Sequence, residues 1–252
     1  MPEFSCRKNL ITGDHFPSDL IGSSSTRRPH WLVRLLEIRD DSECVGSLIS
    51  ETHVLTSGYC CAQKCEDDST CGGEKFAAVL GDWNAATWTG LEQFGVTKAA
   101  HVHPEYNAWS FQNDICLIEL EKPVKLKHNM RPICLPDSPQ VRGPSVGNKC
   151  YVGSYDGDND SYLQQTNLLS CDGTGFGTSH TCIGQSQGAP DDEFCHVNPG
   201  TGFICEDNSG NGVLTGIRSY PISTCSAIQA TTDVSNYIGW LRDLIGAGNP
   251  II

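Results

Sequence analysis

Short apolar runs separated by turn residues fill the chain after its first thirty positions, which show no periodicity. Residues 31–36 alternate as a strand does, and residues 45–50 and 54–59 form two further short runs around a turn. The pattern returns in residues 76–80, 115–120, 150–153 and 212–220. Many short strands without helices between them predict an antiparallel barrel or sandwich rather than a βαβ fold.

Helical spacing is found at the C-terminal end of the chain. Apolar residues recur at every third or fourth position between Val234 and Ile245. Ser235 stands where a helix N-cap is expected, because its side-chain oxygen can accept a hydrogen bond from the first turn. The sequence therefore predicts one helix over residues 235–246.

The cysteine content and the net charge limit the compartments in which the protein is expected and the classes of partner that it can bind. The fourteen cysteines are spread along the chain without paired Cys-x-x-Cys motifs, which favours disulfides and a secreted, extracellular protein over zinc sites. No apolar run is long enough to span a bilayer. The net charge of −13 argues against nucleic acid or heparin as an electrostatic partner and leaves a neutral or basic protein as a candidate.

The segment from Cys195 to Cys205 has the spacing of a nucleophile loop whose usual form is Cys-x-Gly-Asp-Ser-Gly-Gly-Pro followed by two apolar residues and Cys. Other motifs agree with it in order and spacing: 54–60, 113–117, 131–136 and 219–221. On these motifs the chain resembles the trypsin/chymotrypsin-like serine proteases from about Leu20 to Ile245. The resemblance puts Tyr59 at the general-base histidine position, Asp114 at the orienting aspartate and Pro199 at the nucleophilic serine.

These substitutions remove the groups on which the family's chemistry depends. A proline has no side-chain group that can attack a carbonyl, and it has no N–H for the oxyanion hole. The phenol of Tyr59 titrates near ~10 and cannot take the two-sided role of an imidazole. Asp114 is then expected to remain as a buried hydrogen-bond acceptor, with Tyr59 as its donor. The sequence predicts a pseudo-protease without a catalytic residue.

The resemblance also assigns the positions around the substrate pocket. Glu193 stands at the base of the pocket, Ser219 begins the segment that replaces Ser-Trp-Gly, and Pro221 and Thr231 replace glycines that keep the pocket open. Asn198 replaces the acidic residue that pairs with a newly cut amino terminus. We therefore expect a closed pocket and a lost activation contact.

The implied architecture is all-β: two six-stranded antiparallel β-barrels, roughly residues 20–130 and 131–234, with the helix packed outside. Residues 20–252 form the protease-homologue domain, and residues 1–19 form a propeptide-like segment of a longer protein, tethered by Cys6. The implied disulfides are Cys6–Cys134, Cys44–Cys60, Cys150–Cys205, Cys171–Cys182 and Cys195–Cys225. The pairing of Cys61, Cys65, Cys71 and Cys116 stays open, and these extra cysteines resemble those of arthropod clip-domain homologues.

Three further features of the sequence are weaker indications of a functional site. Asp82 and Glu92 lie in a loop where trypsin-like proteins can bind Ca²⁺, but only this pair matches, so a solvated loop without a cofactor is favoured. Asn159 is in a glycosylation sequon. Residues 207–212 resemble a nucleophile motif but lie after Cys205, where they predict a hairpin turn rather than a displaced nucleophile.

The sequence thus favours a secreted, inactive serine protease homologue that binds a protease, a zymogen or an immune factor as a cofactor or regulator of a protease cascade, as in arthropod melanisation. Two alternatives remain. One is a secreted effector that binds a host ligand, as salivary or parasite homologues do. The other is a residual hydrolase that uses an unconventional nucleophile.

Overall fold

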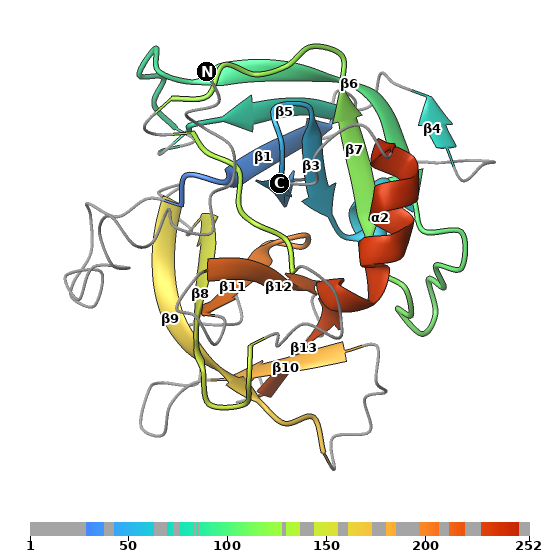
Figure 1. Ribbon diagram of the computed structural model, residues 1–252. Coiled ribbons are helices and arrows are strands. Elements are labelled where there is room, and N and C mark those ends of the chain that lie inside the picture. Colours follow the sequence, from blue (N-terminus) through green and yellow to red (C-terminus); the bar gives the residue numbers. More distant parts are fainter. Residues whose placement is uncertain are drawn as a thin grey trace.

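The architecture rests on two closed β-barrels that lie one above the other (Figure 1). The computed structural model describes residues 29–37, 43–62, 70–72, 76–82, 84, 86–127, 130–136, 144–155, 161–172, 180–184, 197–206, 212–219 and 228–246. Both barrels are antiparallel throughout. The all-β fold of two six-stranded barrels that the sequence predicted is confirmed.

The first barrel closes where its two outer strands, β6 and β7, pair. Its strands are β1 (Leu32–Glu37), β2 (Glu43–Leu48), β3 (His53–Thr56), β5 (Phe76–Leu80), β6 (Gln93–Val102) and β7 (Cys116–Leu120). A short seventh strand, β4 (Thr70–Gly72), lies along the edge of β6. The interior is filled by alternate apolar side chains such as Val33, Leu35 and Ile118, as expected for strands with a two-residue side-chain period.

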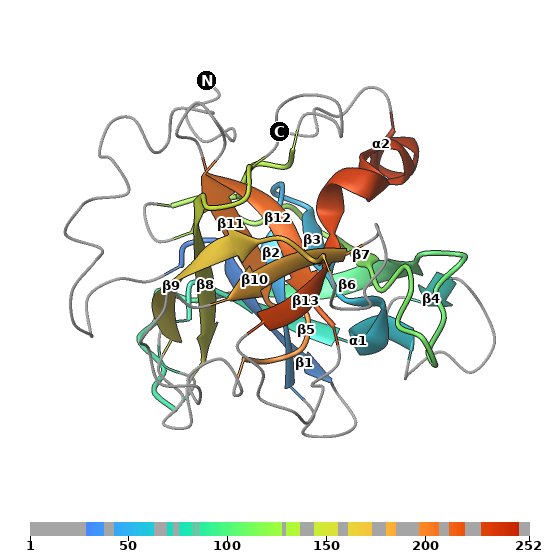
Figure 2. The same cartoon turned by 90° about the horizontal axis from the view of Figure 1, so that it is seen from below.

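The second barrel follows in the chain and closes where β9 pairs with β10. Its strands are β8 (Lys149–Tyr155), β9 (Ser161–Leu169), β10 (His180–Gly184), β11 (Gly202–Glu206), β12 (Gly212–Arg218) and β13 (Ile228–Asp233). Among the described residues, its interior contains the fully buried ring of Phe203 in a cluster with Val152 and Ile183. Figure 2 shows this barrel from below.

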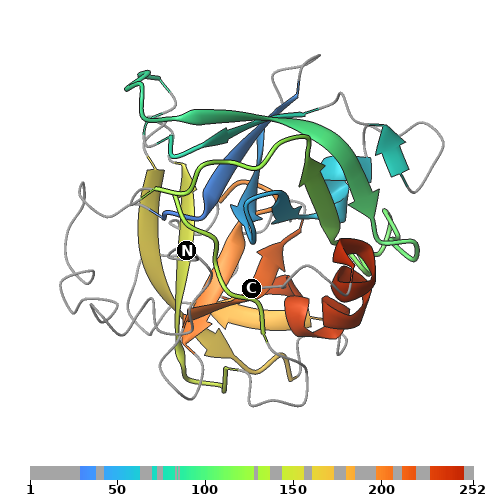
Figure 3. The same ribbon diagram turned by 45° about the horizontal axis from the view of Figure 1, so that its top comes forward.

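A separate apolar cluster joins the barrels to the C-terminal helix α2 (Ile238–Ile245). Leu117 of the first barrel and Leu214 of the second pack in one cluster with Leu241 of the helix. Figure 3 shows α2 at the side of the two barrels. No helix among the described residues is both long and apolar enough to cross a membrane.

The start of the terminal helix differs from the prediction. Val234–Tyr237 form a 3₁₀ turn before α2 begins. The cap is Asp233 and not Ser235, because the Asp233 carboxylate accepts hydrogen bonds from both the main-chain N–H and the hydroxyl of Ser235, at 2.9 and 2.7 Å. A carboxylate at this position satisfies one of the free N–H groups of the first turn.

Disulfides join described residues of both barrels. Cys44–Cys60 and Cys61–Cys116 lie in the first barrel, and Cys150–Cys205 and Cys171–Cys182 lie in the second. Three of these pairs were implied by the family resemblance. The fourth, Cys61–Cys116, joins two cysteines whose pairing the sequence left open. Cys134 is also disulfide-bonded, and its expected partner Cys6 lies outside the described residues. Also outside the described residues are Cys65, Cys195 and Cys225, and the side chain of Cys71 is not described either.

The two barrels approach each other closely at Gly200. Its φ of +83° lies in the left-handed region that favours glycine. A Cβ atom at this position would lie 2.1 Å from the carbonyl oxygen of Val45 and 2.1 Å from the hydroxyl of Thr56. Backbone on the facing barrel therefore leaves no room for a side chain here.

We predict that Gly200→Ala lowers the free energy of unfolding by at least about 3 kcal/mol, because backbone strain adds to the overlap with Val45. The matched control is Gly239→Ala, since Gly239 is exposed in α2 and a Cβ there meets nothing within 4 Å. The free energy of unfolding of Gly239→Ala should rise by about 1 kcal/mol, because alanine has a higher helix propensity than glycine. Chemical denaturation of both variants measures the difference, and equal stabilities would contradict the packing at Gly200.

Candidate functional site

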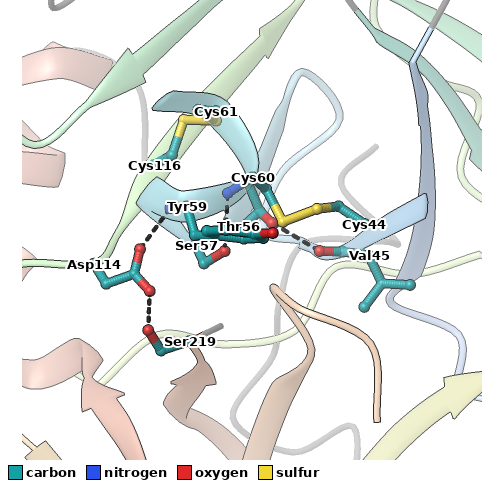
Figure 4. The surroundings of a disulfide bond; sticks show 10 residues. All are labelled: Cys44, Val45, Thr56, Ser57, Tyr59, Cys60, Cys61, Asp114, Cys116 and Ser219. Carbon is teal, nitrogen blue, oxygen red and sulfur yellow. Dashed lines mark hydrogen bonds between the residues drawn. A yellow bond between two sulfur atoms is a disulfide. The ribbon is translucent and has the colours of Figure 1, made fainter. Parts of the chain in front are cut away.

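The site forms around the short helix α1 (Gly58–Ala62), which follows β3. The Ser57 hydroxyl accepts a hydrogen bond from the N–H of Cys60 at 3.2 Å and so caps the turn. The neighbouring residues Cys60 and Cys61 form disulfides to Cys44 of β2 and Cys116 of β7, respectively (Figure 4). Because the two bonds lead to different strands, α1 is fixed in both position and orientation.

Asp114 links α1 to the second barrel. Its carboxylate is fully buried. One oxygen, Oδ1, accepts a hydrogen bond from the main-chain N–H of Tyr59 at 2.6 Å, and the other, Oδ2, accepts one from the hydroxyl of Ser219 (Figure 4). The backbone of Gly58 donates a third. The structure thus brings Tyr59, Asp114 and Ser219 together, but the donor from Tyr59 is its main chain and not its phenol.

Burial governs the electrostatics of this cluster. It raises the pKa of Asp114 from 3.8 to about 6, against the opposing effect of the hydrogen bonds from Ser219, Tyr59 and Gly58. Burial and the neighbouring Asp114 and Tyr59 also raise the pKa of Tyr106. Among the described residues, the groups that donate to Asp114 are main-chain N–H groups and a hydroxyl, and none is an imidazole.

The segment that carries Pro199 is held between the barrels. The carbonyl of Pro199 accepts a hydrogen bond from the N–H of Val45 on β2 at 3.0 Å, and the next residue, Gly200, donates to the carbonyl of Arg218 on β12 at 2.9 Å. The segment therefore lies against the strands that lead to α1 and to Ser219. At its centre, Pro199 supplies neither a hydroxyl nor an N–H to this region.

Asn198 is engaged with the second barrel. Its side-chain oxygen accepts a hydrogen bond from the Ser154 hydroxyl of β8 at 2.8 Å, and its main-chain N–H donates to the same hydroxyl at 3.2 Å. The hydroxyl of Thr201 lies 3.4 Å from that of Ser154. A neutral network therefore surrounds Asn198, to which the sequence resemblance assigns the place of an acidic residue.

The remaining pocket positions are only partly described. Thr231 is fully buried in β13, where its hydroxyl donates to the carbonyl of Thr181 at 3.1 Å. A Cβ atom on Gly216 of β12 would lie 2.2 Å from that hydroxyl, so Thr231 fills the space above Gly216. Glu193 and Pro221 lie outside the described residues, as do Asn159 and most of the turn at 207–212.

The loop between Asp82 and Glu92 is exposed at residues 86–91, as expected for a solvated loop, but the two acidic side chains themselves are not solvated. Both side chains are buried, because each has a protein partner: Asp82 forms an ion pair with Arg34 at 3.0 Å, and Glu92 accepts hydrogen bonds from Thr89. Burial raises the pKa of Asp82 despite the nearby guanidinium. Burial alone would raise the pKa of Glu92, but hydrogen bonds outweigh it and the pKa is lowered.

Sequence reasoning missed Ser154 and Arg34. Ser154 gives no signal in the sequence, because its role depends on a partner 44 positions away. Arg34 does give one, since it is the single charge in the apolar run 31–36. A charge in a buried strand needs a partner of opposite sign.

The trypsin family model matches residues 21–241 of the chain. Serine protease 1 of Rattus norvegicus is 27% identical over 220 residues, which cover 81% of the chain and 80% of the rat protein. Trypsin-3 of Salmo salar is 30% identical over 220 residues, which cover 81% of the chain and 83% of the salmon protein. Granzyme M of Rattus norvegicus is 25% identical over 258 residues, which cover 94% of the chain and 93% of the granzyme.

We predict that Asp114→Asn removes a pH dependence of stability without loosening the fold. Because the folded pKa of about 6 lies above 3.8, the stabilising contribution of the protonated carboxyl is full below pH 3.8 and is lost as pH rises through 6. Its size is about 3 kcal/mol for two pH units. An asparagine can still accept from Tyr59 and can donate to the hydroxyl of Ser219.

Chemical denaturation between pH 4 and 8 tests this prediction. The quantity compared at each pH is the difference in free energy of unfolding between the wild type and the variant. At pH 8 Asp114→Asn should be at least as stable as the wild type, whereas the control Asp114→Ala should lose about 1–3 kcal/mol because buried donors lose their acceptor. An asparagine variant as unstable as the alanine variant would show that the charge itself is required.

Proposed function

The chain belongs to the trypsin-like serine protease family, and we propose that it is a member without catalytic activity that keeps the fold as a protein-binding scaffold. One observation carries the proposal: Pro199 stands at the nucleophile position of the family motif. Covalent catalysis needs a group that can attack the carbonyl, and the oxyanion needs N–H donors. Proline supplies neither at this position.

The surroundings of Asp114 support the same conclusion. In the family mechanism this aspartate orients an imidazole, which takes the proton from the nucleophile. Here its oxygens accept from main-chain N–H groups and from Ser219, and Tyr59 stands at the base position. The carboxylate therefore serves to join α1 to the second barrel, which is a structural role.

An exposed apolar patch supports protein binding. It consists of Trp88, Leu91, Phe94 and Val96, and the rings of Trp88 and Phe94 stack at 4.9 Å while remaining 61% and 60% exposed. Val96 extends the patch along β6, since it lies two residues after Phe94 on the same face of the strand and is also exposed. Solvent-facing positions of an antiparallel sheet are usually polar, and an apolar cluster there marks an interaction surface.

We place this scaffold outside the cell, as a cofactor or regulator of a protease cascade. The disulfides support an oxidising compartment. The cascade role, including the comparison with arthropod clip-domain homologues in innate immunity, rests on analogy with inactive family members. The second candidate is a secreted effector that binds a host ligand. The same patch supports both candidates, so the identity of the partner distinguishes them.

A residual hydrolase is the third candidate, and Ser219 is the hydroxyl that favours it. It is hydrogen-bonded to a carboxylate whose pKa of about 6 is close to neutral pH. However, Ser219 directly follows β12, whose last residue, Arg218, is held by backbone hydrogen bonds to Gly200 and Thr201, and the Ser219 hydroxyl points to Asp114 in Figure 4. Attack on a substrate would require it to leave a buried acceptor unpaired.

We predict that the wild type is not labelled by a fluorophosphonate probe and does not cleave peptides after Arg or Lys. The double reversion Tyr59→His with Pro199→Ser should remain at least about 10³-fold below an active trypsin, because Asn198 and Thr231 still differ from the family pattern. Labelling of the wild type that Ser219→Ala abolishes would support the hydrolase. Robust cleavage by the double variant would refute the closed pocket.

We further predict that Phe94→Ser combined with Val96→Ser weakens partner capture by about tenfold or more, since aromatic anchors dominate interface energy. The control is Trp109→Ser, because Trp109 is 96% exposed and does not belong to the patch. Affinity capture from the body fluid of the source animal, and from host plasma, gives the measurement. Capture from plasma alone would favour the effector, and equal capture by all variants would exclude this patch.

A further inference from the structure

A buried ion pair closes the loop between β5 and β6. Arg34 lies on β1, and its Nη2 is 3.0 Å from Oδ2 of Asp82, with the two side chains only 13% and 4% exposed. The other oxygen of Asp82 accepts a hydrogen bond from the N–H of Asn84 at 3.2 Å. Both carboxylate oxygens are therefore engaged with protein groups.

The second barrel contributes to the same cluster. The hydroxyl of Tyr155 on β8 donates to the carbonyl of Asp82 at 3.0 Å. The guanidinium of Arg34 lies 6.0 Å from the centre of the Tyr155 ring, at the limit of a cation–π contact. The cation is thus enclosed by the loop on one side and by the facing barrel on the other.

Glu92 completes the loop as a second buried acid. Its Oε1 accepts from the N–H and hydroxyl of Thr89 at 2.8 and 2.6 Å. Its Oε2 is buried and has no hydrogen-bond partner among the described residues. The negative charge of Glu92 raises the pKa of Asp82, so the two acids are close enough to repel. A loop with two such acids needs a positive charge beside it.

We propose that the guanidinium of Arg34 is that resident cation, in place of the Ca²⁺ that the family resemblance allows in this loop, and that folding is independent of calcium. Calcium takes about six to eight oxygen ligands, whereas both oxygens of Asp82 already accept from Arg34 and Asn84. A divalent ion on Asp82 would also meet the guanidinium at close range. Among the described residues, no cluster of three or more metal-ligating side chains forms.

This arrangement makes the loop a preformed part of the surface. The loop between Asp82 and Glu92 carries Trp88, and Leu91 precedes the second acid directly. Arg34 on β1 holds the Asp82 end of this segment, and Thr89 holds Glu92 at the other end, so neither end requires a bound ion. The inference concerns the stability of the loop, so it stands whether or not the protein is catalytically inactive.

Thermal unfolding of the full chain in EGTA and in millimolar CaCl₂ tests the proposal. The wild type should have the same Tm in both media. Arg34→Met should lose about 10 °C in EGTA, because it leaves a buried charge unpaired, and calcium should restore part of the loss. The control Lys98→Met breaks an exposed ion pair with Glu119 (2.7 Å, side chains 60% and 30% exposed) and should lose about 2 °C or less.

A second variant covers the case in which Arg34→Met does not fold. Arg34→Met combined with Asp82→Asn removes both charges and should be more stable than the single variant, with no response to calcium. Titration calorimetry of the wild type with CaCl₂ should give no binding heat. Three results would overturn the proposal: calcium raising the wild-type Tm by more than about 5 °C, Arg34→Met matching Lys98→Met, or Arg34→Met losing the same amount in both media.

Discussion

The structure depends on how one buried carboxylate is satisfied. Asp114 lies at the junction of the two barrels, where an ionised group costs much free energy unless donors surround it. The N–H of Tyr59 comes from the first barrel and the hydroxyl of Ser219 from the second, so the acid fixes one barrel on the other. Two disulfides hold the helix that presents this N–H. The site is therefore a rigid structural joint, whatever chemistry it supports.

Asp114 and Asp82 are both buried acids that contact both barrels, but their partners differ. Asp114 is held by neutral dipoles, which leave its pKa raised to about 6. Asp82 is held by a full charge on Arg34, yet burial still raises its pKa. In both cases the partner joins segments far apart in the chain. A fold built on such contacts persists when catalytic groups are replaced, which is why the fold alone does not establish activity.

Much of the fold could be predicted from the sequence, because strand alternation and motif order are local signals. The strand containing Leu32 and the helix containing Leu241 were both expected where they occur. The Cys61–Cys116 pair was not, since a disulfide between residues 55 positions apart depends on how strands close the barrel. The cap Asp233 and the acceptor role of Asp82 were missed for a similar reason: hydrogen bonding, and not composition, decides which polar group is used.

The central claim is that Pro199 and Tyr59 leave the family architecture without a nucleophile that can form an acyl-enzyme. Intact-mass spectrometry after incubation with a reactive guanidinobenzoate ester tests it most directly, because a serine protease retains the acyl group on its nucleophile. The account predicts that the mass stays that of the unmodified chain while an active trypsin gains one acyl group. A stoichiometric acyl adduct on a serine of this chain would contradict it.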